Sequence, residues 1–395
     1  MLYNDYTTKL LDMEHMEIKN IEVYPSELIL HVEMKRRMHI CPRCGEETDK
    51  VHDYRLQIVK DCPVQGRAVI WKYRKRRYKC ECCGKMFYEQ NRLLPKHHRI
   101  TNRLALSVLQ KLSMKVSRKD IAREFGVSES SVCRWMHLAP FSKPKKLPKV
   151  LSIDEFKGNA GGEKFQCILT SPVEKRILDI LPNRKERTIF DYLNTFSNKR
   201  DVKYFVTDMR REYISMAKAL FPNAKIVIDK FHVVRYCTWA LENVRKRVQK
   251  ALPDEKRKYF KRSRKLLLMH MDKLKADEKL AVSKMLEINK DLADAYLMKE
   301  KFYHFMSSRN KDEARTRIKE FGMYNAVTQL PEFEKLIGIL SNWSEYILNA
   351  FDCSYSNGFT EGCNNKIKVI KRIAFGYRSF ENLRQRILLT TNAAN

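Results

Sequence analysis

Short apolar runs and longer amphipathic stretches alternate along this chain, and their order predicts its structural elements. Five runs in the middle of the sequence are brief and rich in β-branched residues, which is typical of buried strands. They cover residues 149–154, 165–170, 176–181, 204–207 and 225–228. A helical pattern lies between the third and fourth runs, and another between the fourth and fifth. We therefore expect a mixed sheet in which a three-strand meander precedes a helix, a strand, a helix and a last strand.

The N-terminal part begins with strand-like patterns. Alternating apolar positions in residues 17–34 predict a strand or a hairpin. Residues 57–59 and 67–73 are also expected to form strands, which would lie between two groups of cysteines.

From Thr101 the pattern becomes helical. Two short helices, expected at 118–125 and 129–138, are joined by a turn that contains Gly126, and Ser128 is suited to cap the second helix. Such a pair predicts a helix-turn-helix. Many three-helix cores share this pattern without binding DNA, but here it follows a basic module.

The C-terminal half is mostly helical in pattern. Three prolines among lysines in residues 140–149 first predict a linker. The stretch 238–348 has a helical period almost throughout, and we expect it to be an all-helical insertion. A further amphipathic helix around Glu361 and a last docking helix from Phe380 follow.

Carboxylates end three of the predicted strands. Asp154, Asp208 and Asp229 each close an apolar run. Ligands of open α/β sheets bind at the carboxyl ends of the strands, so these side chains are expected at one edge. A single aspartate there is more often a helix cap. Three of them indicate a carboxylate cluster, which suits a divalent metal ion.

Glu361 supplies a further acid. On a helix, Glu361, Asn365, Lys368 and Arg372 are spaced i, i+4, i+7 and i+11 and share one polar face. This arrangement suits a glutamate that binds metal beside an amide and cations that bind phosphate. An ordinary amphipathic surface helix is the alternative.

Two pairs of cysteines have the spacing of zinc knuckles. Cys41 and Cys44 form one Cys-x-x-Cys-Gly motif, and Cys80 and Cys83 form the other. Four thiolates in such pairs close a tetrahedral Zn²⁺ site. Cys82 is an alternative to Cys80 or Cys83, but the spacing and the following glycine favour the pair chosen. Redox or core cysteines are the other interpretation.

Charge narrows the choice of partner. The 395 residues include 78 Lys and Arg and 47 Asp and Glu, which gives a net charge of +31. Such a protein attracts polyanions, and nucleic acid is the leading candidate. No apolar run is long enough to span a membrane, and the first residues lack a signal-peptide pattern. We therefore expect an intracellular protein whose cysteines are reduced.

Two regions are the main candidates for DNA contact. The run Arg67–Lys79 holds seven basic residues and no acid, interleaved with aromatic residues; an exposed basic edge strand is the alternative. The second helix of the helix-turn-helix would lie in the major groove. The expected contacts are Arg67, Lys72, Arg74, Arg76 and Arg77 on the strand and Glu129, Ser130 and Arg134 on the helix.

These motifs together resemble a known family. The zinc knuckles, the helix-turn-helix, Ser-Ile-Asp154-Glu-Phe, Val-Thr-Asp208-Met, Asp229-Lys-Phe-His232 and Asn-Gly-x-x-Glu361-Gly-x-Asn-Asn-Lys resemble bacterial insertion-sequence transposases of the DDE class. The branch is the one called ISL-three, and the resemblance extends over nearly the whole chain.

The resemblance implies an α/β RNase H-like catalytic core that carries the helical insertion. Asp154, Asp208 and Glu361 would form a metal-binding triad for Mg²⁺ or Mn²⁺, with Asp229 and His232 as accessory residues. A packed structural role for His232 is about as probable on sequence alone. The expected partners are double-stranded DNA at transposon ends and targets, and a second protomer in a homodimer on DNA. The expected location is the bacterial cytoplasm, at the nucleoid.

The expected organisation therefore has six parts. They are a zinc ribbon (1–95), a helix-turn-helix (96–139), a linker (140–149), the first part of the core (150–237), the helical insertion (238–348) and the last part of the core (349–395). Two other functions remain open at this point. One is a DNA-binding regulator with an inactive nuclease-like fold, and the other is an RNase H-like nuclease that does not transpose.

Overall fold

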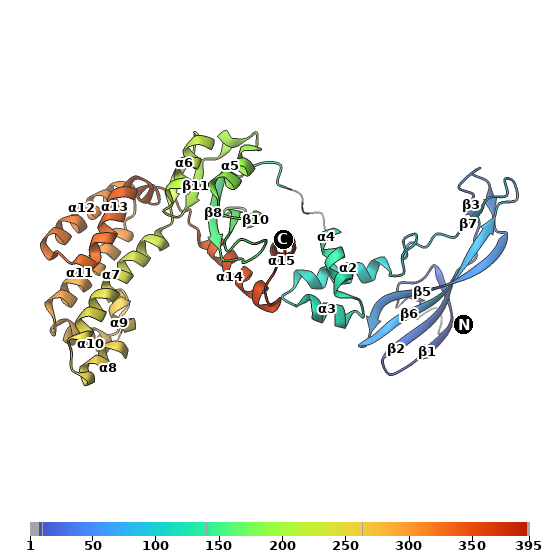
Figure 1. Cartoon of the computed structure of the whole chain (residues 1–395), viewed down its shortest axis with the longest axis horizontal. Helices are drawn as coiled ribbons and strands as arrows, with labels where there is room; N and C mark the ends of the chain where they lie inside the picture. The colour runs from blue at the N-terminus through green and yellow to red at the C-terminus, as the bar shows by residue number, and fades with distance from the viewer. Residues whose placement is uncertain (1–7, 10, 139–140, 142, 263, 393–395) are drawn as a thin grey trace. The chain divides into compact units, whose positions relative to one another are not determined.

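A computed structural model describes residues 8–9, 11–138, 141, 143–262 and 264–392 of the chain. It consists of two compact units. The first unit contains Met1–Phe141 and Val369–Asn395, and the second contains Ser142–Lys368. The predicted linker, residues 140–149, lies partly outside the described residues. Figure 1 labels the helices and strands along the chain.

The first unit begins with a five-stranded sheet in the order β1-β2-β6-β5, with β7 also paired to β6. β1 and β2 form the antiparallel hairpin expected for residues 17–34. The two strands predicted between the cysteines are also present, as the long antiparallel pair β5 and β6. The strands are β1 (Met16–Val23), β2 (Glu27–Met34), β3 (His39–Ile40), β4 (Glu47–Thr48), β5 (Val51–Val64), β6 (Arg67–Lys79) and β7 (Met86–Tyr88).

The basic strand β6 separates its apolar and cationic side chains, as the sequence predicted. Val69, Trp71 and Tyr73 alternate along it and are buried. They pack in a cluster with Met16 and Leu30 of the neighbouring hairpin. The burial of two large aromatic rings therefore holds this sheet together.

Three helices follow the sheet: α2 (Asn102–Ser113), α3 (Arg118–Glu124) and α4 (Glu129–Leu138). Their apolar faces share one core, which includes Leu104, Ile121 and Val132. The turn between α3 and α4 contains Gly126 at a φ of +60°. The hydroxyl of Ser128 accepts a hydrogen bond of 3.2 Å from the Ser131 N–H, so the predicted helix cap is confirmed.

The last helix of the chain, α15 (Phe380–Asn392), packs against α2 and α4. Leu389 belongs to the core of the three helices. The Arg386 guanidinium donates hydrogen bonds to the carbonyls of Met114 (2.9 Å) and Val116 (2.5 Å). The expected domain 349–395 therefore spans both units, because the apolar side chains of α15 are buried by the helix-turn-helix.

The second unit contains a mixed five-stranded sheet in the order β10-β9-β8-β11-β12. β8, β9 and β10 form the predicted antiparallel meander, whereas β11 and β12 run parallel to β8. The strands are β8 (Val150–Phe156), β9 (Gln166–Ser171), β10 (Arg176–Leu181), β11 (Tyr204–Thr207) and β12 (Lys225–Ile228). β8 continues for two residues beyond Asp154, so this acid lies within its strand.

Successive residues of β8 serve opposite faces of the sheet. Leu151 and Ile153 pack with helices α5 (Glu186–Asn194) and α6 (Arg211–Leu220). Ser152 and Asp154 therefore point to the other face, since strand side chains alternate. Helix α14 (Gly358–Ile373) contacts that face, as described below. A short helix, η1 (Lys199–Asp201), precedes β11.

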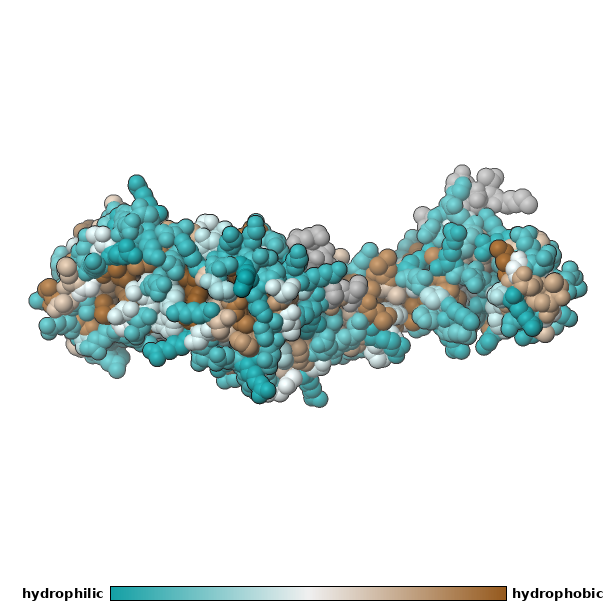
Figure 2. Space-filling model, turned by 90° about the horizontal axis from the view of Figure 1, so that it is seen from above, coloured by the Kyte–Doolittle hydropathy of each residue, from teal (hydrophilic) through white to brown (hydrophobic). Residues whose placement is uncertain are grey.

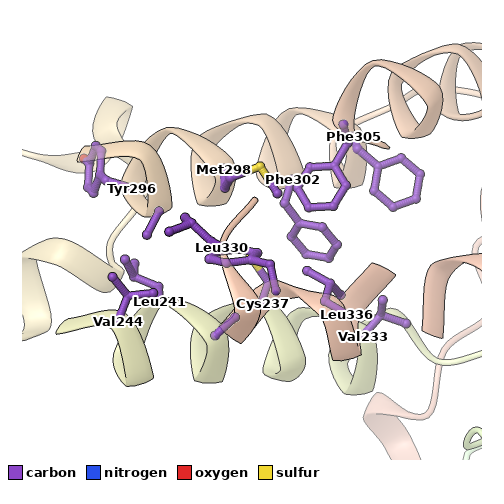
Figure 3. Close-up of a cluster of buried hydrophobic side chains, with 14 of the residues drawn as sticks. Val233, Cys237, Leu241, Val244, Tyr296, Met298, Phe302, Phe305, Leu330 and Leu336 are labelled. Atoms are coloured by element: carbon purple, nitrogen blue, oxygen red, sulfur yellow. The ribbon is translucent and has the colours of Figure 1, made fainter. Parts of the chain in front are cut away.

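The region predicted to be helical is helical almost throughout. Figure 3 shows its core, where Val233, Cys237 and Leu241 of α7 point toward Met298 and Phe302 of α11. The elements are α7 (Lys230–Lys250), α8 (Asp254–Arg262), α9 (Arg264–Leu268), η2 (Met271–Lys273), α10 (Ala276–Leu286), α11 (Lys290–Met306), α12 (Lys311–Thr328) and α13 (Pro331–Asn349).

The outer surface is largely polar. On the face drawn in Figure 2, hydrophilic residues cover most of the surface and apolar residues lie between them. Among the described residues, no helix is both long and apolar enough to cross a membrane.

Candidate functional site

Three aspartates come from adjacent parallel strands. Asp154 lies near the end of β8, Asp208 follows β11, and Asp229 follows β12 as the N-cap residue of α7. The Asp229 N–H donates a hydrogen bond of 3.2 Å to the Thr207 carbonyl, which continues the pairing of β11 and β12. The expectation that the acids stand at one edge of the sheet agrees with this topology.

His232 lies between two of these acids. Its Nδ1 atom is 2.9 Å from Oδ1 of Asp208 and 3.6 Å from Oδ2 of Asp229. The three atoms lack a well-aligned hydrogen-bond partner, so the contacts are charge pairs at short range. Burial would lower the pKa of His232, but the two carboxylates outweigh it and raise this pKa to about 10.

Glu361 reaches the same cluster from the first turn of α14. Ligand atoms of Asp229, His232 and Glu361 all lie within 4.8 Å of one another. Burial, followed by the charge of Asp229, raises the pKa of Glu361. Among the described residues, this group is therefore tighter than the expected set of Asp154, Asp208 and Glu361, because His232 attracts the carboxylates around it.

Asp154 is the most perturbed acid of the cluster. It is 8% exposed. Burial comes first and the charge of Asp208 second in raising its pKa to about 7, and Glu361 adds to the effect. One carboxylate oxygen accepts a hydrogen bond of 2.7 Å from the Asn364 amide, and the other accepts one of 2.7 Å from the Glu155 N–H.

Buried hydroxyl groups attach α14 to the sheet. The Thr360 hydroxyl is 3.0 Å from the Ser152 hydroxyl and 2.8 Å from that of Thr170, and Ser152 also donates to the Asn357 side chain. These four residues are fully buried. Since Glu361 follows Thr360 directly, the cluster fixes the start of the helix that carries the glutamate.

Sequence reasoning missed Asn364, Thr360 and Asn357. It chose Asn365, four positions after Glu361, whereas Asn364, three positions after it, also lies beside it on a helix. The spacing alone does not distinguish the two amides. The composition of the motif was a signal, since adjacent asparagines in the middle of a helix are poor helix formers.

The residue after Asp154 belongs to a second polar network. Glu155 accepts hydrogen bonds of 2.8 Å from the Arg184 guanidinium and from the Tyr213 hydroxyl, and it also pairs with Arg210. This network balances the charge of Glu155. The neighbouring cluster of Asp154, Asp208, Asp229 and Glu361 has only His232 as a close cationic partner among the interactions of the described residues, so its donor set suits a divalent cation.

The other predicted residues of α14 are exposed. Asn365, Lys368 and Arg372 have accessible side chains, and the Lys368 ammonium donates a hydrogen bond of 3.1 Å to the Asn365 carbonyl oxygen. They therefore remain available to a ligand such as phosphate.

The four predicted cysteine ligands meet in the first unit. The Sγ atoms of Cys41 and Cys83 are 3.5 Å apart, as are those of Cys44 and Cys80, and all four lie within 4.8 Å of one another. A tetrahedral ZnS₄ site with bonds of about 2.3 Å requires sulfur separations of about 3.8 Å. The residues therefore fit Zn²⁺, and Cys82 is exposed and outside the cluster.

The two knuckles have the same backbone conformation. The N–H groups of Gly45 and Gly84 donate hydrogen bonds of 3.0 Å to the carbonyls of Cys41 and Cys80. Both glycines have positive φ angles, of +78° and +68°. This turn requires glycine and brings each pair of thiols to the same side.

The basic strand β6 differs in part from expectation. Arg76 is buried, where it donates hydrogen bonds to Glu33 and to the Met34 carbonyl. It was expected to contact phosphate, but burial and pairing make it a structural cation. Lys72 pairs with Glu22, Arg74 with Glu33 and Arg77 with Asp53, whereas Arg67 is half-buried.

The predicted recognition helix α4 has one open face. Glu129, Ser130 and Arg134 are exposed, whereas Val132 is buried. The opposite flank is covered by α15, since His137 lies 2.6 Å from the side-chain oxygen of Asn382. The exposed residues are thus the ones that sequence reasoning chose.

Three family models match successive parts of the chain. Residues 37–83 match the zinc-finger of the transposases of IS204, IS1001, IS1096 and IS1165. Residues 89–139 match the helix-turn-helix domain of transposase family ISL3. Residues 151–387, more than half of the chain, match the transposase domain of the same family.

Individual relatives agree with this assignment. The transposase for insertion sequence element IS1001 of Bordetella parapertussis is 26% identical over 365 residues, which cover 90% of this chain and 89% of the relative. The transposase for IS1557 of Mycobacterium tuberculosis is 26% identical over 192 residues, 43% of either chain. A protein of Lactococcus lactis named an ATP-dependent protease is 44% identical over 61 residues, 15% of this chain and 20% of that protein. The chain therefore belongs to the ISL3 family of insertion-sequence transposases.

Proposed function

We propose that this transposase binds the ends of its element and performs metal-dependent DNA cleavage and strand transfer by the DDE mechanism. The observation that carries the proposal is the convergence of Asp154, Asp208, Asp229 and Glu361 around His232. A surplus of buried carboxylates with raised pKa values is typical of a site that binds cations. The exposed amide and cations of α14 supply nearby partners for phosphate.

Asp154, Asp208 and Glu361 would hold Mg²⁺ or Mn²⁺, with Asp229 in contact through His232. When bound, such ions supply a nucleophile at neutral pH and stabilise the leaving oxygen. Asp154 must give up its proton to bind a cation, which its pKa of about 7 permits near neutral pH. His232 would hold Asp208 and Asp229 in place, and Asn364 would orient Asp154.

The reaction has two steps that need no covalent enzyme intermediate. In the first, an oxygen–phosphorus bond forms from water and the bond to the 3′ oxygen breaks, which leaves a free 3′-OH. In the second, that 3′ oxygen attacks a phosphate of target DNA and displaces another 3′ oxygen. Lys368 and Arg372 would bind the phosphates on both sides of the reacting group.

The other parts of the proposal concern architecture and partners. The sheet of the second unit would be an RNase H-like core, with helices α7 to α13 as an insertion before α14. The Cys₄ cluster would bind Zn²⁺, and the ribbon and helix-turn-helix would read duplex DNA at element ends. Two ends must be joined, so a homodimer on DNA is expected, in the bacterial cytoplasm at the nucleoid.

The test uses labelled fragments that carry the ends of the element encoding the protein. Asp208→Asn should abolish cleavage with Mg²⁺ while end binding changes less than about twofold, because the carboxylate acts in chemistry. If the variant cleaves as well as the wild type, the catalytic assignment is wrong and a DNA-binding regulator is favoured. A pre-nicked end separates the third option: a nuclease that does not transpose would cut DNA but would not join this end to a target.

A further inference from the structure

The first helix of the helical region has an unusual outer face. Phe231, Arg235 and Trp239 lie at i, i+4 and i+8 on α7 and therefore form one stripe. All three are exposed, Phe231 at 53% and Trp239 at 47%. The opposite face of α7 packs into the core drawn in Figure 3. The stripe is thus not needed for the packing of this helix.

Cations and aromatic rings are paired along the stripe. The Arg235 guanidinium lies 4.8 Å from the centre of the Trp239 ring. The Tyr236 ring contacts Trp239 edge to face, with centroids 5.3 Å apart, and the Lys335 ammonium lies 5.3 Å from the Tyr236 ring. Such pairs hold the rings in place while one ring face of Trp239 stays accessible.

A groove lies beside Trp239, between α7 and α13. Its volume is about 320 Å³, and it is lined by Tyr236, Trp239, Ala240, Asn243, Glu332, Lys335 and Leu336. This is at the lower end of the size of small-ligand sites. The lining combines aromatic rings with an amide, a carboxylate and an ammonium group, which are the groups that bind a nucleobase.

Trp239 differs from the other tryptophans. Of the four in the chain, all within the described residues, it alone is exposed, and Trp71 is fully buried. An exposed tryptophan beside two cations suits a ligand that is flat, apolar on its faces and negatively charged at its edge. A nucleotide has this chemistry, and base stacking on an aromatic ring contributes about 1–3 kcal/mol.

The stripe begins at the carboxylates. Asp229 is the N-cap residue of α7, and Arg235 is close enough to lower the pKa of Glu361, against burial and the nearby acids, which raise it. A helix rises about 1.5 Å per residue, so Trp239 lies about 15 Å from Asp229 along the axis. This corresponds to about four steps of 3.4 Å along a DNA strand.

We propose that the stripe Phe231, Arg235 and Trp239 is a stacking site for unpaired bases of the DNA strand that is cut at the carboxylates. Bases inside a duplex are already stacked, so an accessible ring selects a frayed or flipped-out base. Trp239 stacks on a base about four positions from the scissile phosphate, and Arg235 pairs with an intervening phosphate. This inference rests on the proposed function, because it assumes that DNA enters the site.

The experiment measures binding without chemistry. In the full-length protein carrying Asp208→Asn, affinity is compared for a short duplex with a single-stranded thymidine overhang and for the same duplex with blunt ends. Trp239→Leu, which keeps apolar bulk but loses the large ring, should weaken overhang binding about tenfold and blunt binding less than twofold. Trp239→Phe, which keeps a ring, should retain most of the preference.

Two controls accompany these variants. Leu280 of α10 is also exposed, at 59%, and Leu280→Ala should change neither affinity. Tryptophan fluorescence should fall when the overhang binds and should fall less in Trp239→Phe, since stacking quenches the ring directly.

Several outcomes would overturn the inference. They are equal losses for both DNAs, unchanged overhang binding in Trp239→Leu, or a variant whose only change is a smaller assembly in sedimentation, which would mark the stripe as a protein interface. Because cleavage is absent from this assay, its result is independent of whether Asp208 is catalytic.

Discussion

The Asn364 amide donates a hydrogen bond of 2.7 Å to Oδ2 of Asp154, although 210 positions separate the two residues. The bond connects α14 to β8 at the candidate active site. A hydrogen bond to a charged group contributes about 1.5–3 kcal/mol. Asn364 therefore orients the carboxylate that is most deeply buried in the cluster.

Asn364→Ala should lower the rate of end cleavage about 10- to 100-fold with little change in DNA affinity. Asn365→Ala is the matched control, because this neighbour is exposed and does not contact Asp154 in any interaction recorded for the described residues. It should weaken DNA binding more than it slows cleavage. Single-turnover kinetics separate the two effects, and identical profiles for both variants would contradict the assignment.

Thr360→Val should destabilise the second unit by about 1–2 kcal/mol. The new methyl group replaces a hydroxyl that contacts Ser152 and Thr170, so two buried hydroxyls lose a partner. Thr360→Ser keeps the hydroxyl and should cost less. Chemical denaturation measures both, and a fall in cleavage with Thr360→Val alone would show that the cluster positions Glu361.

Stability without added divalent cations should fall as pH rises. Burial and Asp208 raise the pKa of Asp154 from 3.8 to about 7, so its contribution to folding is present at low pH and is lost as pH rises through about 7. The carboxylates raise the pKa of His232 from 6.5 to about 10, against burial, so its contribution is complete below about pH 6.5 and is lost by about pH 10.

Asp154→Asn should therefore stabilise the protein at pH 8 by about 2 kcal/mol and reduce the pH dependence. The exposed Asp352 provides the control Asp352→Asn, which should have little effect. Thermal unfolding at several pH values tests this, and added Mg²⁺ should raise the unfolding temperature of the wild type more at pH 8 than at pH 6. An equal Mg²⁺ effect in Asp154→Asn would argue against metal binding by Asp154.

Cys80→Ser should abolish zinc binding and lower affinity for element ends, since one thiolate of the four-sulfur cluster is lost. Cys82→Ser changes an exposed thiol outside that cluster and should retain the metal. Zinc per chain, measured after dialysis, distinguishes them. Loss of zinc in Cys82→Ser would reverse the ligand assignment.

Phe375→Gly should stabilise the first unit by about 1 kcal/mol. Phe375 has a φ of +53° and is 99% exposed, at the end of α14. Its N–H donates to the Arg372 carbonyl, and the Gly376 N–H donates to the Lys371 carbonyl, a helix end at which glycine is preferred. Phe375→Ala removes the ring without relieving the backbone and should not stabilise. Denaturant unfolding compares the three proteins.

Local patterns in the chain were enough to predict the helix-turn-helix, the strands of both sheets and the zinc knuckles. These depend on residues close in sequence: a capping serine, an alternating strand, or two cysteines separated by two residues and followed by glycine. The three aspartates could also be assigned to one sheet edge, because strand order and polarity follow from the sequence of elements. The overall domain content was therefore encoded in short segments.

Only the tertiary structure decided which side chains meet. It chose Asn364 over Asn365, placed His232 between Asp208 and Asp229, buried Arg76 against Glu33, and packed α15 on the helix-turn-helix. Helical and strand periods state which face a residue occupies, but not what covers that face. That choice depends on packing between segments up to 210 positions apart, where small rotations of a helix exchange one contact for another.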